Sequence, residues 1–149
     1  MRRALGLLLA AASLLLAGCV TPAPTTSAYE SKAGMTAKAA VSEINTALVA
    51  TDAYLQGRMG SAYLETLLSE SEDSLGSVHD TFDSVQPPAT AGADALRGTL
   101  DPLLDDAGAA VTELRIAARR DRSADLRTTA GDLSNVVDQL DAFGKRHAS

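Results

Sequence analysis

The chain of 149 residues has little of the chemistry that most enzymes and metal proteins use. It contains one cysteine, two histidines and no tryptophan, and aromatic residues make up 3% of it. A single cysteine excludes an internal disulfide. The hydrophobic fraction is nevertheless 46%, so the apolar residues are mostly Ala, Leu and Val. This composition favours closely packed helices and argues against a β-sandwich, which needs β-branched and aromatic residues.

No arrangement of residues typical of a catalytic or metal site is present. His147 stands next to the end of the chain, and His79 has Gly76 three positions before it, so the Glu-x-x-His motif of di-iron bundles is absent. His79 and Asp83 have the i,i+4 spacing of a solvated ion pair or an edge contact on a helix. No nucleophile elbow and no phosphate-binding glycine loop occurs. We therefore expect no enzyme activity, no metal and no cofactor.

The first residues read as an export signal. Arg2 and Arg3 give a positive start, and an apolar run continues from Ala4 to Leu16. This run is shorter than the ~20 apolar residues that a membrane span needs. It has the length of the apolar region of a signal peptide.

The segment Leu16-Ala17-Gly18-Cys19 resembles the lipobox of bacterial lipoproteins. That resemblance implies cleavage between Gly18 and Cys19 and a diacylglyceryl group on the Cys19 thiol. Two acyl chains anchor a protein stably, whereas one binds marginally. The protein is therefore expected on a cell membrane, facing outside the cytoplasm on the extracellular or periplasmic side. The alternatives are an ordinary secretory signal with a chance cysteine, and a twin-arginine signal at Arg2 and Arg3.

The mature chain beyond the signal peptide of residues 1–18 is acidic and begins with prolines. Cleavage removes two of the 13 basic residues and none of the 19 acidic ones, so the mature net charge is about −8. Such a chain is expected to be repelled by nucleic acid and by an anionic membrane surface. Residues 19–27 carry Pro22 and Pro24, which favour an extended linker of roughly 25 Å. The linker is either a plain spacer or a spacer that carries O-linked sugars. The candidate attachment residues are Thr21, Thr25, Thr26 and Ser27.

Apolar residues then recur at helical spacing in four segments and nowhere with the alternation of a strand. The segments are 28–57, 61–86, 90–120 and 123–147. Their predicted buried stripes are Val41, Ile44, Leu48, Thr51 and Leu55 in the first; Leu64, Leu68, Ser71, Leu75, Val78, Phe82 and Val85 in the second; Ala93, Leu96, Leu100, Leu103, Ala107, Val111 and Leu114 in the third; Leu126, Ala130, Leu133, Val137 and Leu140 in the fourth.

Turn residues separate these segments. Gly57 and Gly60 bracket the first turn, with Ser61 as the candidate cap of the next helix. Pro87 and Pro88 end the second segment, and Thr90 is the candidate cap of the third. The third break rests on the charged residues 119–122, the candidate cap Ser123 and a shift of register; one long bent helix is the alternative there. Pro102 predicts a kink in the third segment, or else a fresh helix capped by Asp101.

The sequence therefore predicts an all-α domain over residues 28–149, an antiparallel up-down-up-down four-helix bundle. In that topology the first and third turns share the end of the bundle that is distal to the linker. Basic residues would gather there, and we regard them as a candidate anion-binding tip for an envelope polymer: Arg115, Arg119, Arg120 and Arg122. The alternative is that these cations only compensate helix dipoles.

These features favour a membrane-anchored, non-enzymatic binding or interaction module of the cell envelope, whose partner is an envelope polymer or protein. The alternative is a carrier that holds a small apolar ligand or lipid in a groove opened by Ala and Gly at core positions. The Arg-rich, Lys-poor composition indicates a GC-rich genome, and the chain resembles small actinobacterial lipoproteins of unassigned function.

Overall fold

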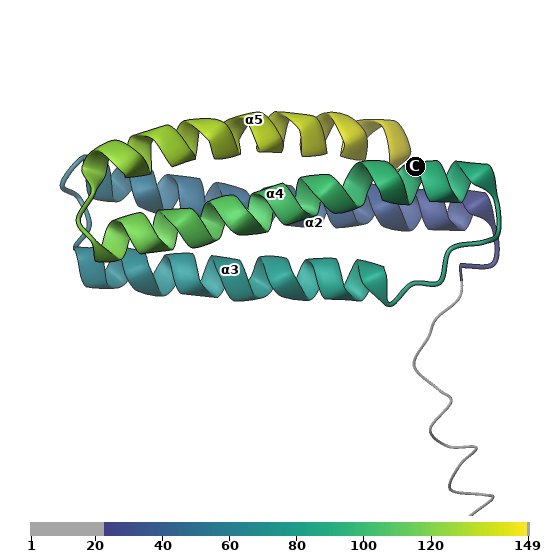
Figure 1. The fold of residues 1–149 in the computed structure, drawn as a ribbon, viewed down its shortest axis with the longest axis horizontal. Coiled ribbons are helices and arrows are strands. Elements are labelled where there is room, and N and C mark those ends of the chain that lie inside the picture. Colours follow the sequence, from purple (N-terminus) through teal and green to yellow (C-terminus); the bar gives the residue numbers. More distant parts are fainter. Residues whose placement is uncertain (1–22, 149) are drawn as a thin grey trace, which may run out of the picture.

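A computed structural model describes residues 23–148 of the chain, and within them four helices form an antiparallel bundle. The helices are α2 (Thr26–Leu55), α3 (Ser61–Asp83), α4 (Ala91–Arg119) and α5 (Ser123–His147). The described residues include no strand. The chain runs up and down in sequence order, so that each helix is antiparallel to the next (Figure 1). The predicted all-α four-helix bundle is confirmed.

Residues with positive φ and hydrogen-bonding caps form the turns between the helices. Gly57 adopts φ 71° in the α2–α3 turn, a conformation that glycine tolerates best. The α4–α5 connection reverses the chain through Asp121, at φ 51°, so the alternative of one long bent helix is wrong. Thr90 caps α4 as predicted, because its side chain accepts a hydrogen bond from the Ala93 N–H. Ser61 and Ser123 are not caps; each is the first residue of its helix.

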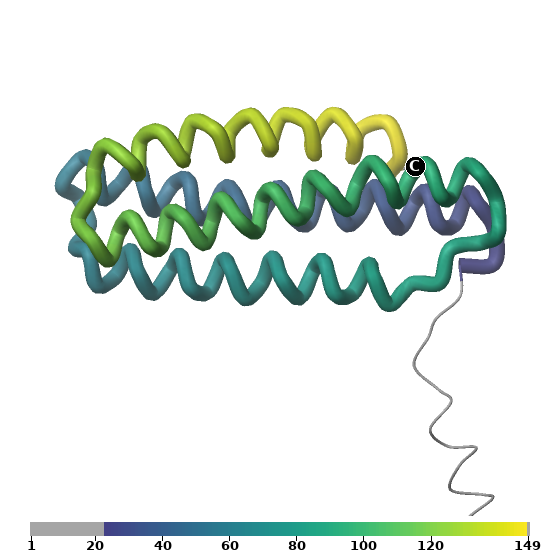
Figure 2. Tube along the Cα trace, in the orientation of Figure 1, coloured from purple at the N-terminus to yellow at the C-terminus, as the bar shows by residue number. Residues whose placement is uncertain are grey.

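Contacts between side chains and loops tie each end of the bundle together. At the distal end, which holds the turns at 56–60 and 120–122, the Tyr54 hydroxyl donates a hydrogen bond of 2.6 Å to Asp121. At the proximal end, where the chain enters α2 and α5 finishes, the Thr26 and Thr90 hydroxyls lie 3.1 Å apart. Figure 2 shows both ends, with the longer α3–α4 loop at the proximal one.

Alanine, rather than the larger residues of the predicted stripe, forms most of the buried face of α2. Ile44 and Thr51 are buried as predicted, whereas Val41, Leu48 and Leu55 are only half-buried. α2 contacts all three other described helices and, with α4, forms the closer of the two diagonals of the bundle. Small side chains allow such close approach. The buried alanines of α2 are Ala33, Ala37, Ala40, Ala47 and Ala50.

Two glycines bring α2 and α5 into closest contact. A Cβ on Gly34 would lie 2.4 Å from the backbone nitrogen of Ala148, and one on Gly144 would lie 3.1 Å from Cγ of Lys38. A real Cβ essentially never approaches another atom as closely as the first of these. The absence of a side chain at Gly34 is therefore used for helix packing and not for a groove.

α4 continues as one helix through Pro102, so no fresh helix starts there. Leu104 is buried, and Leu103, which was predicted to be, is half-buried. The buried positions Leu100, Leu104 and Ala107 keep regular helical spacing through the proline, so the prediction chose the wrong one of two adjacent leucines. The buried face then continues through Ala107, Val111 and Leu114, as predicted.

The bundle begins earlier than the predicted linker boundary at residue 27. Thr25 caps α2 by accepting a hydrogen bond from the Ala28 N–H, and Thr26 already belongs to the helix. Ala23 is buried, and its N–H donates to the Gln86 carbonyl at 3.3 Å. The extended linker is therefore wrong for Thr26 and Ser27, which are helical, and Ala23 is docked on the bundle, whereas Thr25 has the extended backbone that was predicted. The predictions for Cys19 and the signal peptide lie outside the described residues.

No described helix is both long enough and apolar enough to pass through a bilayer.

Candidate functional site

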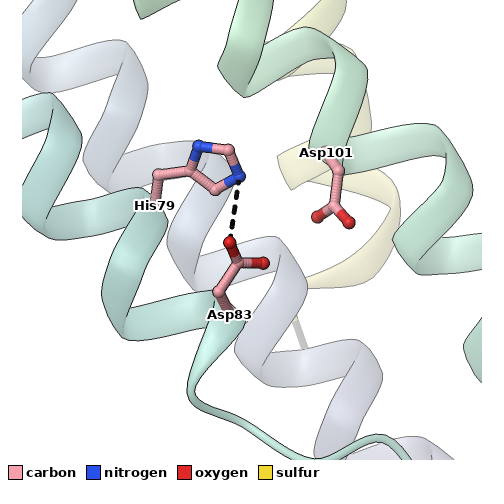
Figure 3. Close-up of side chains that lie close together, drawn as sticks. All are labelled: His79, Asp83 and Asp101. Atoms are coloured by element: carbon pink, nitrogen blue, oxygen red, sulfur yellow. Dashed lines mark ion pairs between the residues drawn. The ribbon is translucent and has the colours of Figure 1, made fainter.

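Four titratable side chains meet where α3 faces α4 near the proximal end. His79 and Asp83 lie one turn apart on α3, and Asp101 and Asp105 lie one turn apart on α4. The His79 Nε2 atom is 3.7 Å from the Asp83 carboxylate, and its Nδ1 atom is 3.7 Å from that of Asp105. Figure 3 shows the side chains of His79, Asp83 and Asp101 pointing toward a common space between the two helices. We refer to these four residues as the α3–α4 cluster.

Arg97 of α4 is the cation of this region. Its guanidinium lies 3.6 Å from the Asp83 carboxylate and 3.7 Å from that of Asp101, and it donates to the Asp83 backbone carbonyl at 3.3 Å. The guanidinium also lies 5.6 Å from the ring centre of Phe82, which is within cation–π range. Arg97 is thus held by the ring beneath it and by two carboxylates beside it.

The inner wall of the cluster contains polar atoms without partners. Tyr29 is fully buried against Phe82, and its hydroxyl lies beside Arg97; neither this hydroxyl nor the buried Arg97 Nε atom makes a well-formed hydrogen bond to a described residue. The Asp101 Oδ1 atom is also buried and without such a partner. Burial raises the pKa of the Asp101 carboxyl, and Arg97 opposes this change. Burial raises the pKa of the Tyr29 hydroxyl as well, again against Arg97.

The sequence predicted only part of this cluster. The i,i+4 pair of His79 and Asp83 is confirmed as an edge contact on α3. Asp101, Asp105 and Arg97 were not assigned to it, although the i,i+4 spacings within α4 place all three on one face. Their meeting with His79 depends on the register between α3 and α4, which no local pattern in the sequence specifies.

The four arginines of the predicted anion-binding tip do not form one cluster. Arg115 donates hydrogen bonds to the Glu72 carboxylate on α3, Arg119 lies 3.6 Å from Glu65, and Arg122 lies 3.4 Å from Asp125. Arg120 is exposed and has no ion-pair partner among residues 23–148. Three of the four positive charges are thus already matched by carboxylates.

The Glu72–Arg115 pair is the best-formed of these contacts. Both side chains are about three-quarters buried, and the Thr112 hydroxyl donates to the same carboxylate at 2.7 Å. The hydrogen bonds from Arg115 hold the pKa of Glu72 below its ordinary value, and burial opposes them. This arrangement is a link between α3 and α4 and leaves little of Arg115 for a polymer.

Two separate apolar grooves lie along the face shared by α2 and α3, with the exposed polar residues Ser42 and Thr46 between their apolar parts on α2. Met35 and Val49 of α2 are 64% and 69% exposed. One surface groove includes Met35 and a second includes Val49, and both are lined from α2 and α3. We call these residues the α2–α3 apolar strip: Met35, Ala39, Val49, Ala53, Leu67 and Val78.

Known proteins give no further assignment. No family model, no curated protein and no solved structure matches the chain. The residues and their geometry are therefore the basis for assigning a function.

Proposed function

We propose that this chain is a bacterial envelope lipoprotein, held to a membrane by lipid on Cys19, whose helical bundle is a non-enzymatic interaction module. The support for the anchor is the positive and apolar leader that ends in the lipobox-like segment Leu16-Ala17-Gly18-Cys19. No described helix offers a second means of membrane attachment by spanning.

The docking of Ala23 shortens the distance between anchor and bundle. Three residues separate Cys19 from Ala23, and four steps of extended chain reach at most about 14 Å. This is roughly half of the linker length expected from the sequence. The proximal end therefore stands close to the lipid, and the long sides and the distal end are the surfaces that a partner reaches.

The α2–α3 apolar strip is the observation that carries the interaction role. A soluble domain rarely leaves large apolar side chains grouped on one face, and such groups mark sites of protein contact. Met35 and Val49 are 14 residues apart, which is close to four helical turns, so they lie on one face of α2. A partner that offers an apolar helix or segment would bury both grooves at once.

The carrier alternative receives less support. It required small residues at the core to open a groove, but Gly34 and Gly144 lie against the backbone and the side chains of the facing helix. The envelope-polymer hypothesis retains Arg120, the one tip arginine without an ion-pair partner among the described residues. Arg119 and Arg122 are exposed as well, and Arg120 and Arg122 line one surface pocket. Carboxylates nevertheless lie beside Arg119 and Arg122 and lower the positive charge of this end, which weakens the basis for binding an anionic polymer.

The anchor is tested by fractionating cells that express wild type or Cys19→Ser. The wild type is expected in the membrane fraction with the mass of an acylated mature chain, and Cys19→Ser is expected to be released from it. A membrane-bound Cys19→Ser chain, together with a wild type that carries no acyl mass, would contradict the proposal.

The role of the α2–α3 apolar strip is tested by placing a photo-crosslinking residue at Val49 or at Met35. The matched control carries it at Gln139, which is exposed on α5. Adducts are expected in living cells from Val49 and Met35 and not from Gln139. The further substitution Val49→Glu, at an exposed position, should remove the adduct formed from Met35. Equal labelling from all three positions, or no adduct from either strip position, would refute a specific contact.

A further inference from the structure

The α3–α4 cluster has the donor atoms of a metal site, and this inference does not depend on the lipid anchor. We propose that His79, Asp83 and Asp101 bind a divalent transition-metal cation, for which Zn²⁺ is the probe. Ligand atoms of these three residues all lie within 4.8 Å of one another. Two ligand atoms at ~2.0–2.2 Å from a tetrahedral zinc ion lie roughly 3.3–3.6 Å apart. The most widely separated pair therefore has to close by at most about 1.5 Å when the ion binds.

The donor types favour a transition metal over calcium or magnesium. Imidazole nitrogen with carboxylate oxygen is a zinc-type ligand set, whereas Mg²⁺ and Ca²⁺ take oxygen ligands. His79 presents Nε2 toward Asp83 and Nδ1 toward Asp105. A carboxylate on the far nitrogen is the usual device that orients a metal-binding imidazole. Asp105, 3.7 Å from Nδ1, is the residue placed to take this positioning role once it closes to hydrogen-bond distance.

Charge balance points in the same direction. Three carboxylates, from Asp83, Asp101 and Asp105, face one guanidinium, from Arg97. With neutral His79 the group carries a net charge of −2 by that count, which one divalent cation would cancel.

The buried polar atoms supply an independent reason. Tyr29 is fully buried, and its hydroxyl, next to Arg97 and near Asp83 and Asp101, has no hydrogen-bond partner among the described residues. The neighbouring Asp101 Oδ1 atom shares this property. The Arg97 Nε atom is a third buried polar atom without a hydrogen-bond partner in the described part of the chain, and its single N–H can satisfy only one of the two oxygens. Buried polar atoms are nearly always satisfied, so the other oxygen is open to a further ligand.

Arg97 makes the proposal directly testable, because it contacts two of the proposed ligands. Its charge competes with a cation for Asp83 and Asp101. Replacing it by Gln should therefore strengthen metal binding, by about tenfold or more. If the cluster were only a salt-bridge network, removing Arg97 would destabilise the bundle and create no affinity for a metal.

The experiment measures Zn²⁺ binding by titration calorimetry to the untagged full chain, freed of metal and carrying Cys19→Ser so that no thiol competes. One zinc ion per chain is expected, with no comparable binding of Mg²⁺ or Ca²⁺. Asp83→Asn and Asp101→Asn should each weaken binding by at least about tenfold. Asp94→Asn, an exposed change at the start of α4, and His147→Gln, at the other histidine, should leave it unchanged.

Two readouts keep the test decisive if a variant is unstable. Asp83 is half-exposed, so Asp83→Asn should retain the fold, and circular dichroism checks this. Zinc should also shift the side-chain nitrogen resonances of His79 and not those of His147. The proposal is overturned by no zinc binding at millimolar concentration, by unaltered binding in Asp83→Asn and Asp101→Asn, or by weaker binding in a folded Arg97→Gln.

Discussion

Ser71 gives the sharpest stability prediction, because a polar group lies in the apolar stripe of α3. Its side chain is 2% exposed, and its hydroxyl has no hydrogen-bond partner in the described part of the chain. Burying a hydroxyl without a partner costs about 1–3 kcal/mol in proteins. Ser71→Ala removes this cost and gains about 0.5 kcal/mol of helix propensity. Against this stand the few dispersion contacts of one oxygen atom, each worth ~0.1–0.2 kcal/mol.

The expected net effect of Ser71→Ala is a rise of about 1–2 kcal/mol in the free energy of unfolding, or roughly 3–8 °C in Tm for a domain of this size. The assay is urea unfolding monitored by circular dichroism, with comparison at equal m-value. Ser69→Ala is the matched control, because Ser69 is exposed on the same helix and its replacement gains propensity alone. If Ser71→Ala is no more stable than Ser69→Ala, the hydroxyl is satisfied and the reasoning fails.

Two further predictions concern the Glu72–Arg115 link and the glycines. Because Arg115 lowers the pKa of Glu72, this carboxylate stabilises the fold above its unfolded pKa, and the contribution is lost as pH falls through the folded value. Glu72→Gln should cost about 1–3 kcal/mol at pH 7 and much less near pH 3, as measured by urea unfolding at both pH values; an equal cost at both would contradict the ionic role. Gly57→Ala should destabilise by about 1–2 kcal/mol, because φ is 71° there, whereas Gly131→Ala, whose added Cβ meets nothing within 4 Å, should stabilise α5 by about 0.5–1 kcal/mol. Thermal melts of the two glycine variants check this difference, and a shift of the same sign in both would refute it.

Four contacts, three of them tertiary, change which surfaces a partner could use, relative to the expectation from the sequence. The buried Ala23 brings the proximal end near the proposed anchor, so a partner meets the sides or the distal end of the bundle. Arg115, Arg119 and Arg122 are paired with carboxylates, which favours the α2–α3 apolar strip over the tip. Most of these contacts join segments that are distant in the sequence.

Interactions between residues close in the sequence were sufficient to predict the four helices and most of the residues at which they begin and end. Thr90 caps α4, and the recurrence of Leu64, Leu68 and Leu75 specifies a buried face, because each of these effects acts within a few residues. α3, however, ends at Asp83, three residues before the limit at residue 86 that the prolines predicted. The same is true of the contact between His79 and Asp83, which one helical turn brings together.

The packing of the helices against one another decided which face of α2 is buried and which side chains meet in the α3–α4 cluster. The pattern on α2 favoured Val41 and Leu48, but the face that packs against the other helices is formed mostly by alanines. A single helix does not show which of its faces its neighbours will cover. Likewise Asp101 reaches His79 only because α3 and α4 are aligned in one particular register. Spacing along the chain determines which side chains share a helix face, whereas the relative placement of two helices depends on how the whole core fills space.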